Sequence, residues 1–339
     1  MTSGRIAQIV LAAWLIPSAG AWAQLRIVSW NTASSSGSLN PGTDVVLAAM
    51  GAESVNGIAR PVDVFVLQEQ SAGHGSEAAL VSVLNGIYGA GTYAHGTGNP
   101  WSGDGLYVGI VYNTNTVQLL EELFFKAGGN SRDSGRYRLR PVGYGPAADI
   151  YIYNTHYKAG TGSTDRRRRA EEARVVRWHA SYGADALGAE ANVIYAGDYN
   201  MRSSSEDALM SSYDTSRDNP YSYILTAQAP WGSSGNGRGA DPVGRPGYWH
   251  DNSAYKDIHT QNPSYNFVGG GMDDRFDMQL LCTDLLDGEG VSYIGPAVGD
   301  IPAATHSYRP FGNNGTHPLN GKISQGTGAS PAVLAALET

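Results

Sequence analysis

The stretch VIYAGDYN, residues 193–200, carries the signal that decides the fold. Its first four residues are mostly apolar, which predicts a strand buried within a sheet. A glycine follows, and then Asp198 and Asn200 place a carboxylate and a carboxamide two residues apart. Because side chains at i and i+2 of a strand project to the same face, we expect both to reach one reacting centre.

Four more predicted strands carry a polar side chain at or near an end. They are Asn31 in 25–31, Glu69 in 62–69, His156 in 148–157 and Asp277 in 273–282. One such residue is ordinary, because chains leave a sheet through turn formers and helix caps. If the five strands share one sheet, these side chains converge at an edge where open α/β sheets commonly bind ligands. The set therefore predicts a site.

The residue types in this set suit phosphoryl chemistry. Oxygen ligands such as Glu69 and Asn31 are typical of Mg²⁺ or Ca²⁺ sites, and a chain with one cysteine offers no thiolate cluster for zinc. A cation on a phosphoryl oxygen neutralises charge that builds in the transition state. Asp198 would align and deprotonate a water, while Asn200 would hold that water without adding charge.

The remaining pattern alternates strands and helices, which predicts an α/β fold. The predicted helices are 43–56 with Thr43 as N-cap, 76–89 with Ser76 as cap, and 163–181 with an alanine-rich apolar stripe. Residues 105–113 and 117–125 are predicted to form a strand pair, and 211–262 are irregular.

Composition and charge narrow the function classes. The chain has 339 residues, of which 41% are hydrophobic and 16% charged, so residues 24–339 are expected to fold as one globular domain. A net charge of -8 argues against coating nucleic acid by bulk charge, but permits an enzyme that binds one phosphodiester locally. The run Arg166–Arg169 is followed by Glu171 and Glu172 at pairing distance, which favours a solvated helix face over a nucleic-acid patch.

Residues 1–23 have the features of a signal peptide. Arg5 precedes a short apolar run, and the sequence Ala21-Trp22-Ala23 fits cleavage after Ala23. A membrane anchor is the alternative, but Pro17 interrupts a run that is short for a span. We therefore expect a secreted or periplasmic protein, with no membrane insertion. Cys282 is the one cysteine, so no internal disulfide forms, and we expect it to be buried.

The ordered segments of the chain resemble those of the endonuclease/exonuclease/phosphatase superfamily. The matching segments are IVSWN, VFVLQEQ, IYNTHYKAG, VIYAGDYN and YNFVGGGMDDRFDMQLL, which span residues 25 to about 282 in the same order as in the family. This resemblance implies a deoxyribonuclease I-like fold, a four-layer α/β sandwich of two packed mixed sheets flanked by helices. It also implies a metal-dependent phosphoric ester hydrolase.

The resemblance further implies a role for each candidate residue. Glu69 matches the metal-binding glutamate, and Asn31 matches the asparagine that helps to place the metal or the phosphate. Asp198 matches the aspartate that activates the attacking water, with Asn200 beside it. His156 matches a histidine that hydrogen-bonds the phosphate. Asp277 matches the aspartate that supports a C-terminal catalytic histidine.

The family's closing SDH.P segment is absent from this sequence. Three explanations are open. The chain given stops short of the final strand, towards which SPAVLAALET would lead as a helix, or His317 in GTHPLN substitutes, or His306 in ATHSYRP does. For both histidines, a loop residue without a catalytic role is the competing interpretation.

The substrate is the least determined part of the prediction, because one fold serves many phosphoesters. The segment NTHYKAG and the arginine-led helix after it resemble secreted bacterial nuclease-like members, which favours DNA or RNA, with Mg²⁺ as cofactor and Mn²⁺ or Ca²⁺ as alternatives. A sphingomyelinase-like lipid phosphodiesterase is the alternative enzyme, with the aromatic-rich residues 218–234 as its membrane contact. A non-catalytic secreted binding protein on the same fold is the alternative of another class.

Overall fold

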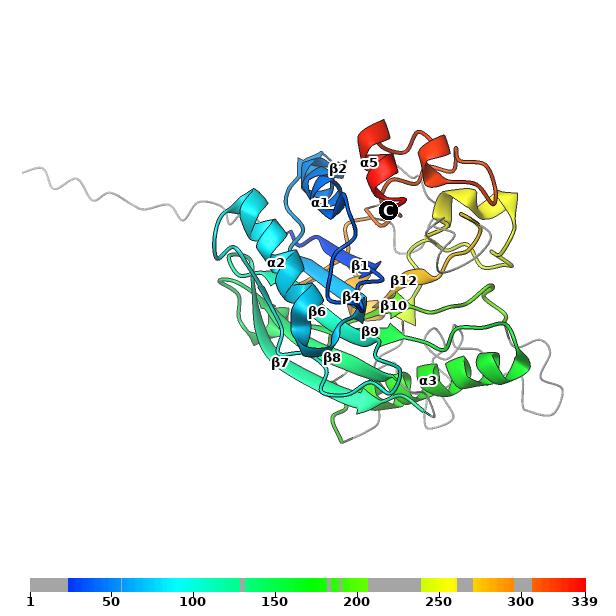
Figure 1. Ribbon diagram of the computed structural model, residues 1–339. Helices are drawn as coiled ribbons and strands as arrows, with labels where there is room; N and C mark the ends of the chain where they lie inside the picture. Colours follow the sequence, from blue (N-terminus) through cyan, green and yellow to red (C-terminus); the bar gives the residue numbers. More distant parts are fainter. Residues whose placement is uncertain are drawn as a thin grey trace, which may run out of the picture.

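Two β-sheets pack face to face in the computed structural model, with helices on their outer surfaces (Figure 1). The structure describes residues 24–55, 57–128, 132–181, 184–188, 191–206, 239–260, 271–295 and 307–339. The predicted signal peptide, His306 and the aromatic-rich residues 218–234 lie outside these described residues.

The first sheet has four strands in the order β1-β4-β6-β5. These are β1 (Ile27–Asn31), β4 (Val64–Gln70), β6 (Tyr107–Asn113) and β5 (Tyr93–His95). β1 and β4 are parallel, whereas β6 runs antiparallel to both of its neighbours, so the sheet is mixed. A small separate ladder joins β2 (Ser54–Val55) to β3 (Ile58–Ala59).

The second sheet has six strands in the order β11-β12-β10-β9-β8-β7. These are β11 (Gly239–Ala240), β12 (Asp277–Cys282), β10 (Asn192–Asp198), β9 (Ile150–His156), β8 (Asp133–Pro141) and β7 (Val117–Lys126). Only β9 and β10 are parallel among these pairs. The predicted sandwich of two mixed sheets is therefore confirmed.

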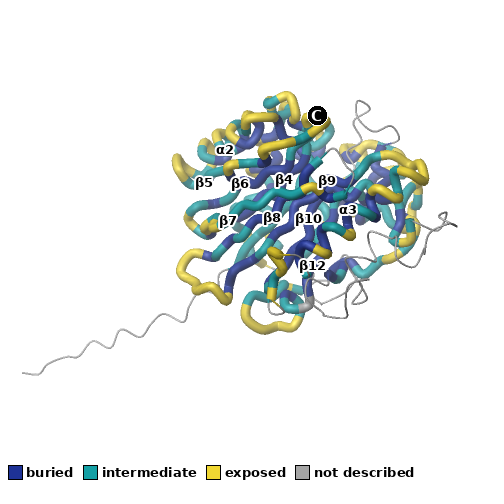
Figure 2. Tube along the Cα trace, turned by 90° about the horizontal axis from the view of Figure 1, so that it is seen from below, coloured by how far each residue is buried: buried dark blue, intermediate teal, exposed yellow. Residues whose placement is uncertain are grey.

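Helices complete a four-layer sandwich. α1 (Thr43–Ala52) and α2 (Gly75–Tyr88) cover the outer face of the first sheet, and α5 (Pro331–Ala336) packs against α1. α3 (Ser163–Ser181) covers the second sheet, and its predicted stripe of Ala170, Ala173, Val176 and Ala180 is buried there. Figure 2 shows the central strands as the most buried part of the chain. Along β4, Phe65 and Leu67 face the helices while Val64 and Val66 face the other sheet, so an apolar run without alternation is required.

Several predicted details are wrong. β6 and β7 belong to different sheets, so residues 105–113 and 117–125 are not a strand pair. Thr43 is the first residue of α1 rather than its cap, and its hydroxyl donates to the carbonyl of Asn40. α2 begins at Gly75, and the Ser76 hydroxyl instead accepts the backbone N–H of Ser71. Local sequence identified these helices, but their N-caps are Gly42 and His74, one and two residues before the predicted caps.

The arginine-rich start of α3 divides between surface and interior. Arg167 lies 3.9 Å from Glu171, as the pairing prediction requires. Arg169 is buried, and it binds both carboxylate oxygens of Glu206 as well as the carbonyls of Lys158 and Gly160. Arg169 therefore fastens the loop after β9 to the helix.

The predicted buried state of Cys282 is confirmed, and its Sγ lies 3.0 Å from the backbone nitrogen of Val193. Among the residues described, no helix combines the length and the apolar character needed to cross a membrane.

One buried amide joins the two sheets. Asn154 in β9 accepts a 2.7 Å hydrogen bond from Nε2 of Gln68. Its own amide donates to the carbonyls of Leu67 and Gly109, at 2.9 and 3.0 Å, where the β4–β6 ladder is interrupted. These bonds cross from one sheet to the other and leave the buried amide of Asn154 with partners for its oxygen and its nitrogen.

We expect Asn154→Ala to lower the free energy of unfolding by about 3 kcal/mol, because it leaves buried donors and acceptors of both sheets without partners. Urea unfolding would measure this loss. Asn115→Ala, on an exposed turn, is the control, and we expect a change within about 0.5 kcal/mol. Equal stability of the two variants would show that the sheets do not depend on the Asn154 amide.

Candidate active site

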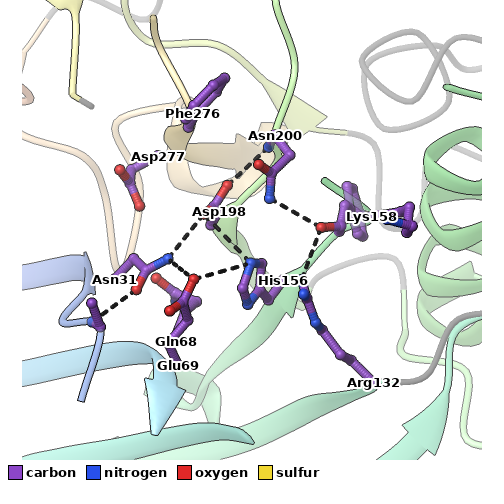
Figure 3. A network of polar contacts seen from close by, with 12 residues as sticks. Asn31, Gln68, Glu69, Arg132, His156, Lys158, Asp198, Asn200, Phe276 and Asp277 are labelled. Atoms are coloured by element: carbon purple, nitrogen blue, oxygen red, sulfur yellow. Dashed lines mark hydrogen bonds and ion pairs between the residues drawn. The ribbon is translucent and has the colours of Figure 1, made fainter. Parts of the chain in front are cut away.

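Three of the predicted residues are direct neighbours across the second sheet. Asp198 at the end of β10 pairs in register with His156 of β9 on one side and with Asp277 of β12 on the other. Their side chains form a row at one end of the sheet (Figure 3). Pairing in register places such side chains about 5 Å apart, so two carboxylates are forced together.

Two further predicted residues come from the first sheet. Asn31 ends β1, and Glu69 lies in an irregularity of β4, where the register with β6 shifts between Leu67 and Gln70. The backbone of Glu69 has φ 56°, an uncommon value for a residue with a side chain. A bulge of this kind re-aims a side chain, and here it turns Glu69 towards the row in the second sheet. The single sheet edge expected from the sequence is therefore wrong, because the site lies between the ends of two sheets.

Asn31 links the two halves of the site. Its Nδ2 donates to Oε1 of Glu69 and to Oδ2 of Asp198, both at 3.0 Å. Nε2 of His156 lies 3.7 Å from the same Glu69 oxygen and 3.6 Å from the same Asp198 oxygen. These two contacts exceed hydrogen-bond distance, so the imidazole faces the carboxylates across a narrow gap (Figure 3).

Asn200 follows the end of the strand rather than continuing it. Its backbone has φ 51°, and its N–H donates to Oδ1 of Asp198 at 2.9 Å. Its side-chain amide donates to the carbonyl of Tyr157 at 3.0 Å. The expected strand geometry for the Asp198 and Asn200 pair is therefore wrong, although the turn does keep both residues beside the cleft.

Gly197 in the opening stretch has a steric role. Its φ is 146°, and a Cβ at this position would lie 2.0 Å from the carbonyl oxygen of Thr155 in β9. A side chain there would force β9 and β10 apart at the level of His156 and Asp198.

A cleft of about 460 Å³ opens over these residues. Its lining includes six residues that bear on the chemistry: Asn31, Glu69, Arg132, His156, Asp198 and Asp277.

Arg132 was not predicted. Its Nε binds Asp104 at 2.8 Å and its Nη1 binds the carbonyl of Tyr157 at 3.2 Å. Arg132 directly precedes β8. This strand was not predicted from the sequence, because its arginines, which alternate with other residues, resemble those of a surface segment. Alternation itself was the signal that would have found it.

Negatively charged carboxylates lie close together in the cleft. Burial raises the pKa of Asp198, and the nearby Glu69 carboxylate raises it further. Burial likewise raises the pKa of Asp277, with Asp198 as the next cause. Burial lowers the pKa of His156 well below its ordinary value, and Arg132 adds to this effect. The imidazole is therefore neutral near neutral pH and does not compensate the carboxylates.

The donor set fits a divalent cation. Glu69, His156 and Asp198 each offer one ligand atom, and these atoms all lie within 4.8 Å of one another. Oδ1 of Asp277 is buried and has no hydrogen-bond partner among the residues described. Carboxylate oxygens that lack donors are the groups a cation would satisfy. Glu69 and Asp198 are the candidate oxygen ligands. Asn31, predicted as a metal-side residue, here turns Nδ2 to these carboxylates, while its Oδ1 accepts the backbone N–H of Ala33 at 3.0 Å.

His317 lies outside this cluster. It is buried, with Nδ1 2.9 Å from the carbonyl oxygen of Pro318 and Nε2 3.1 Å from that of Lys256. Its ring does not line the cleft. The other six predicted residues lie at the cleft, so the structure brings together all but His317.

No protein-family model matches this chain, and no curated protein matches its sequence. Similar chains were found among solved structures. The TDP2 of D. rerio, complexed with single-strand DNA product, is 20% identical over 76% of this chain and 83% of its own, with a TM-score of 0.47. A β-hairpin deletion mutant of beta toxin from Staphylococcus aureus is 17% identical over 83% and 94%, with a TM-score of 0.45. An endonuclease/exonuclease/phosphatase family protein from Bacteroides thetaiotaomicron is 15% identical over 76% and 83%, with a TM-score of 0.43.

We expect Asp198→Asn to stabilise the metal-free protein at neutral pH. A raised folded-state pKa means that the folded state retains a proton that the unfolded chain has lost. The contribution of Asp198 is therefore fully present below the unfolded pKa of 3.8 and is lost as pH rises through its folded value. Between the unfolded and the folded pKa, this proton lowers the free energy of unfolding by about 1.4 kcal/mol for each unit of rising pH.

Urea unfolding in EDTA from pH 4 to 7 would measure this effect as a stability difference between the wild type and Asp198→Asn that widens with pH. Mn²⁺ or Mg²⁺ at about 100 times its dissociation constant should then restore about 2.7 kcal/mol to the wild type and less to the variant. Parallel pH curves for both proteins, in either condition, would contradict the proposed charge crowding.

Proposed function

We propose that this chain is a metal-dependent phosphodiester hydrolase of the endonuclease/exonuclease/phosphatase superfamily. The observation that carries the proposal is the row of His156, Asp198 and Asp277 facing Asn31 and Glu69 across two sheets. Its mixture of carboxylates, a neutral imidazole and an amide suits attack by water on a phosphorus that carries negative charge.

The protein's own groups have distinct parts in this chemistry. Asp198, held by Asn31 and by the N–H of Asn200, is positioned to orient a water and accept its proton. Neutral His156 presents Nε2 to the cleft, where it would hydrogen-bond a phosphoryl oxygen. Arg132 borders the cleft as a permanent cation. A divalent ion bound by Glu69 and its neighbours would neutralise charge on the phosphoryl oxygens.

Nucleic acid is the substrate class we propose, with Mg²⁺ as the ion, in a protein exported after cleavage near Ala23. Arg132 at the cleft supports an anionic substrate. The signal-like residues 1–23 support export to the periplasm or medium. A phospholipid substrate is the alternative, and vesicles of sphingomyelin beside DNA and RNA would separate the two.

We expect the purified protein to hydrolyse bis(p-nitrophenyl) phosphate with Mg²⁺ or Mn²⁺ and not with EDTA. Asp198→Ala should lower the turnover by about a thousandfold, because it removes the group that accepts the water's proton. Release of p-nitrophenolate is the measurement. Asp287→Ala is the matched control, because Asp287 is exposed and does not line the cleft, and it should retain full turnover.

Turnover in Asp198→Ala equal to that of the wild type would sink this proposal. A folded wild type that binds Mn²⁺ but hydrolyses no phosphodiester, lipid or nucleic acid would instead support a binding protein on this fold.

We expect His317→Ala to keep its turnover within about twofold, since a residue packed outside the cleft acts on stability alone. The same variant should lose about 1–2 kcal/mol of unfolding free energy, because the buried ring no longer fills the space beside Lys256 and Pro318. Turnover corrected for folded fraction, measured beside urea unfolding, tests both parts. A loss of several orders of magnitude in turnover would make His317 the missing catalytic histidine.

A further inference from the structure

A second group of metal-ligating side chains lies away from the catalytic cleft. His250 belongs to the segment that follows the buried Trp249, and Asp273 and Asp274 belong to the segment that leads into β12. Backbone hydrogen bonds join the two segments, from the N–H of Asp251 to the carbonyl of Asp273 and from the N–H of Thr260 to that of Asp274. None of the three side chains lines the catalytic cleft.

The three side chains converge on one point. Nδ1 of His250 lies 3.1 Å from both carboxylate oxygens of Asp274 and 3.6 Å from Oδ2 of Asp273. One ligand atom from each residue lies within 4.8 Å of the other two. Asp273 and Asp274 are neighbours in sequence and turn their carboxylates to the same imidazole, so like charges lie close together. Arg202 is a nearby cation that offsets part of this repulsion.

The Asp274 carboxylate accepts fewer hydrogen bonds than its two oxygens can take. Its side chain is 2% exposed, yet no donor outside this cluster reaches its carboxylate within the described part of the chain. The neighbouring Arg275 does not serve it, since its guanidinium binds both oxygens of Asp241 at 2.7 and 2.9 Å. A single ring nitrogen offers at most one hydrogen to two buried oxygens that accept about four. A buried carboxylate with this shortfall is costly unless an ion satisfies it.

We propose that His250, Asp273 and Asp274 bind a divalent cation that accepts a nitrogen ligand, with Zn²⁺ or Mn²⁺ favoured over Ca²⁺ and Mg²⁺. Imidazole suits Zn²⁺ and carboxylates suit Mn²⁺, whereas Ca²⁺ and Mg²⁺ are bound by oxygen ligands alone in most protein sites. Three protein ligands of the His and Asp type are a common zinc donor set, with water in the remaining position.

This cation would fasten a part of the chain that has little regular structure. Between β11 and β12, the described residues form only one short 3-10 helix, Ser253–Ile258. The C-terminal segment meets the same place, where Asn320 donates to Asp251 and the N–H of Met272 donates to the carbonyl of Gly321. Asp274 precedes Asp277 by three residues, so an ion here would order the chain that delivers Asp277 to the cleft. Its role is positioning rather than catalysis.

Isothermal titration of the chelator-stripped protein with Zn²⁺ tests the site, beside thermal unfolding with and without the ion. Asp274→Asn and His250→Gln are the test variants, Asp287→Asn is the matched control, and Glu69→Gln reports on the cleft. We expect each test variant to bind one equivalent fewer than the wild type, or the same equivalent more than about tenfold more weakly. Glu69→Gln and Asp287→Asn should retain this equivalent.

Asp274→Asn keeps the shape of the side chain and removes a buried charge, so its metal-free unfolding midpoint should not fall below that of the wild type. The upward shift of the midpoint with Zn²⁺ should shrink in both test variants. Equal Zn²⁺ stoichiometry and equal shifts in all proteins would overturn the proposal. So would a preference of the site lost in Asp274→Asn for Ca²⁺ over both Zn²⁺ and Mn²⁺.

Discussion

The buried amide of Asn154 is the contact on which the geometry of the site depends. It spans the interface between the sheets, two residues before His156, and it bonds the carbonyl of Leu67 two residues before Glu69. A sandwich core is otherwise held by apolar packing, which is non-directional and tolerates small slides. The directional hydrogen bonds of the Asn154 side chain join β9 to β4 and β6. They fix how far the end of β4 lies from the end of β9, and hence the gap between Glu69 and His156.

The site itself works against stability. Register pairing sets Asp198 beside Asp277, and no lysine or arginine of the described residues forms an ion pair with either. The positive φ of Glu69 adds backbone strain. The surrounding sheets offset this cost because nearly all residues of β4, β9 and β10 are buried (Figure 2). A metal-dependent enzyme benefits from this arrangement, since carboxylates that repel one another when empty bind a cation more favourably. The carboxylates of Asp273 and Asp274 also lie close together, and their repulsion would likewise favour the binding of a cation.

Much of the fold followed from hydrophobic pattern and a few polar residues at strand ends. Apolar runs such as 62–69 and 193–196 identified buried strands, and the alanine stripe identified α3 with its observed bounds. β8 was missed because its arginines, paired with Glu121 and Asp149, resemble surface residues when read alone. The partition of strands between two sheets was also out of reach, since pairing depends on long-range contacts that no local pattern encodes.

The sequence by itself identified the candidate site residues, and the structure places Asn31, Glu69, His156, Asp198, Asn200 and Asp277 at one cleft. One polar residue at a strand end is ordinary, but its recurrence on five predicted strands, in the order seen in the family, identified the set. Only the tertiary structure decided that the site joins two sheets, that a bulge aims Glu69, that Arg132 borders the cleft and that His317 does not. It also brought His250 to Asp273 and Asp274, more than twenty residues apart. These features depend on the packing of distant segments, which follows from the whole chain rather than from any stretch within it.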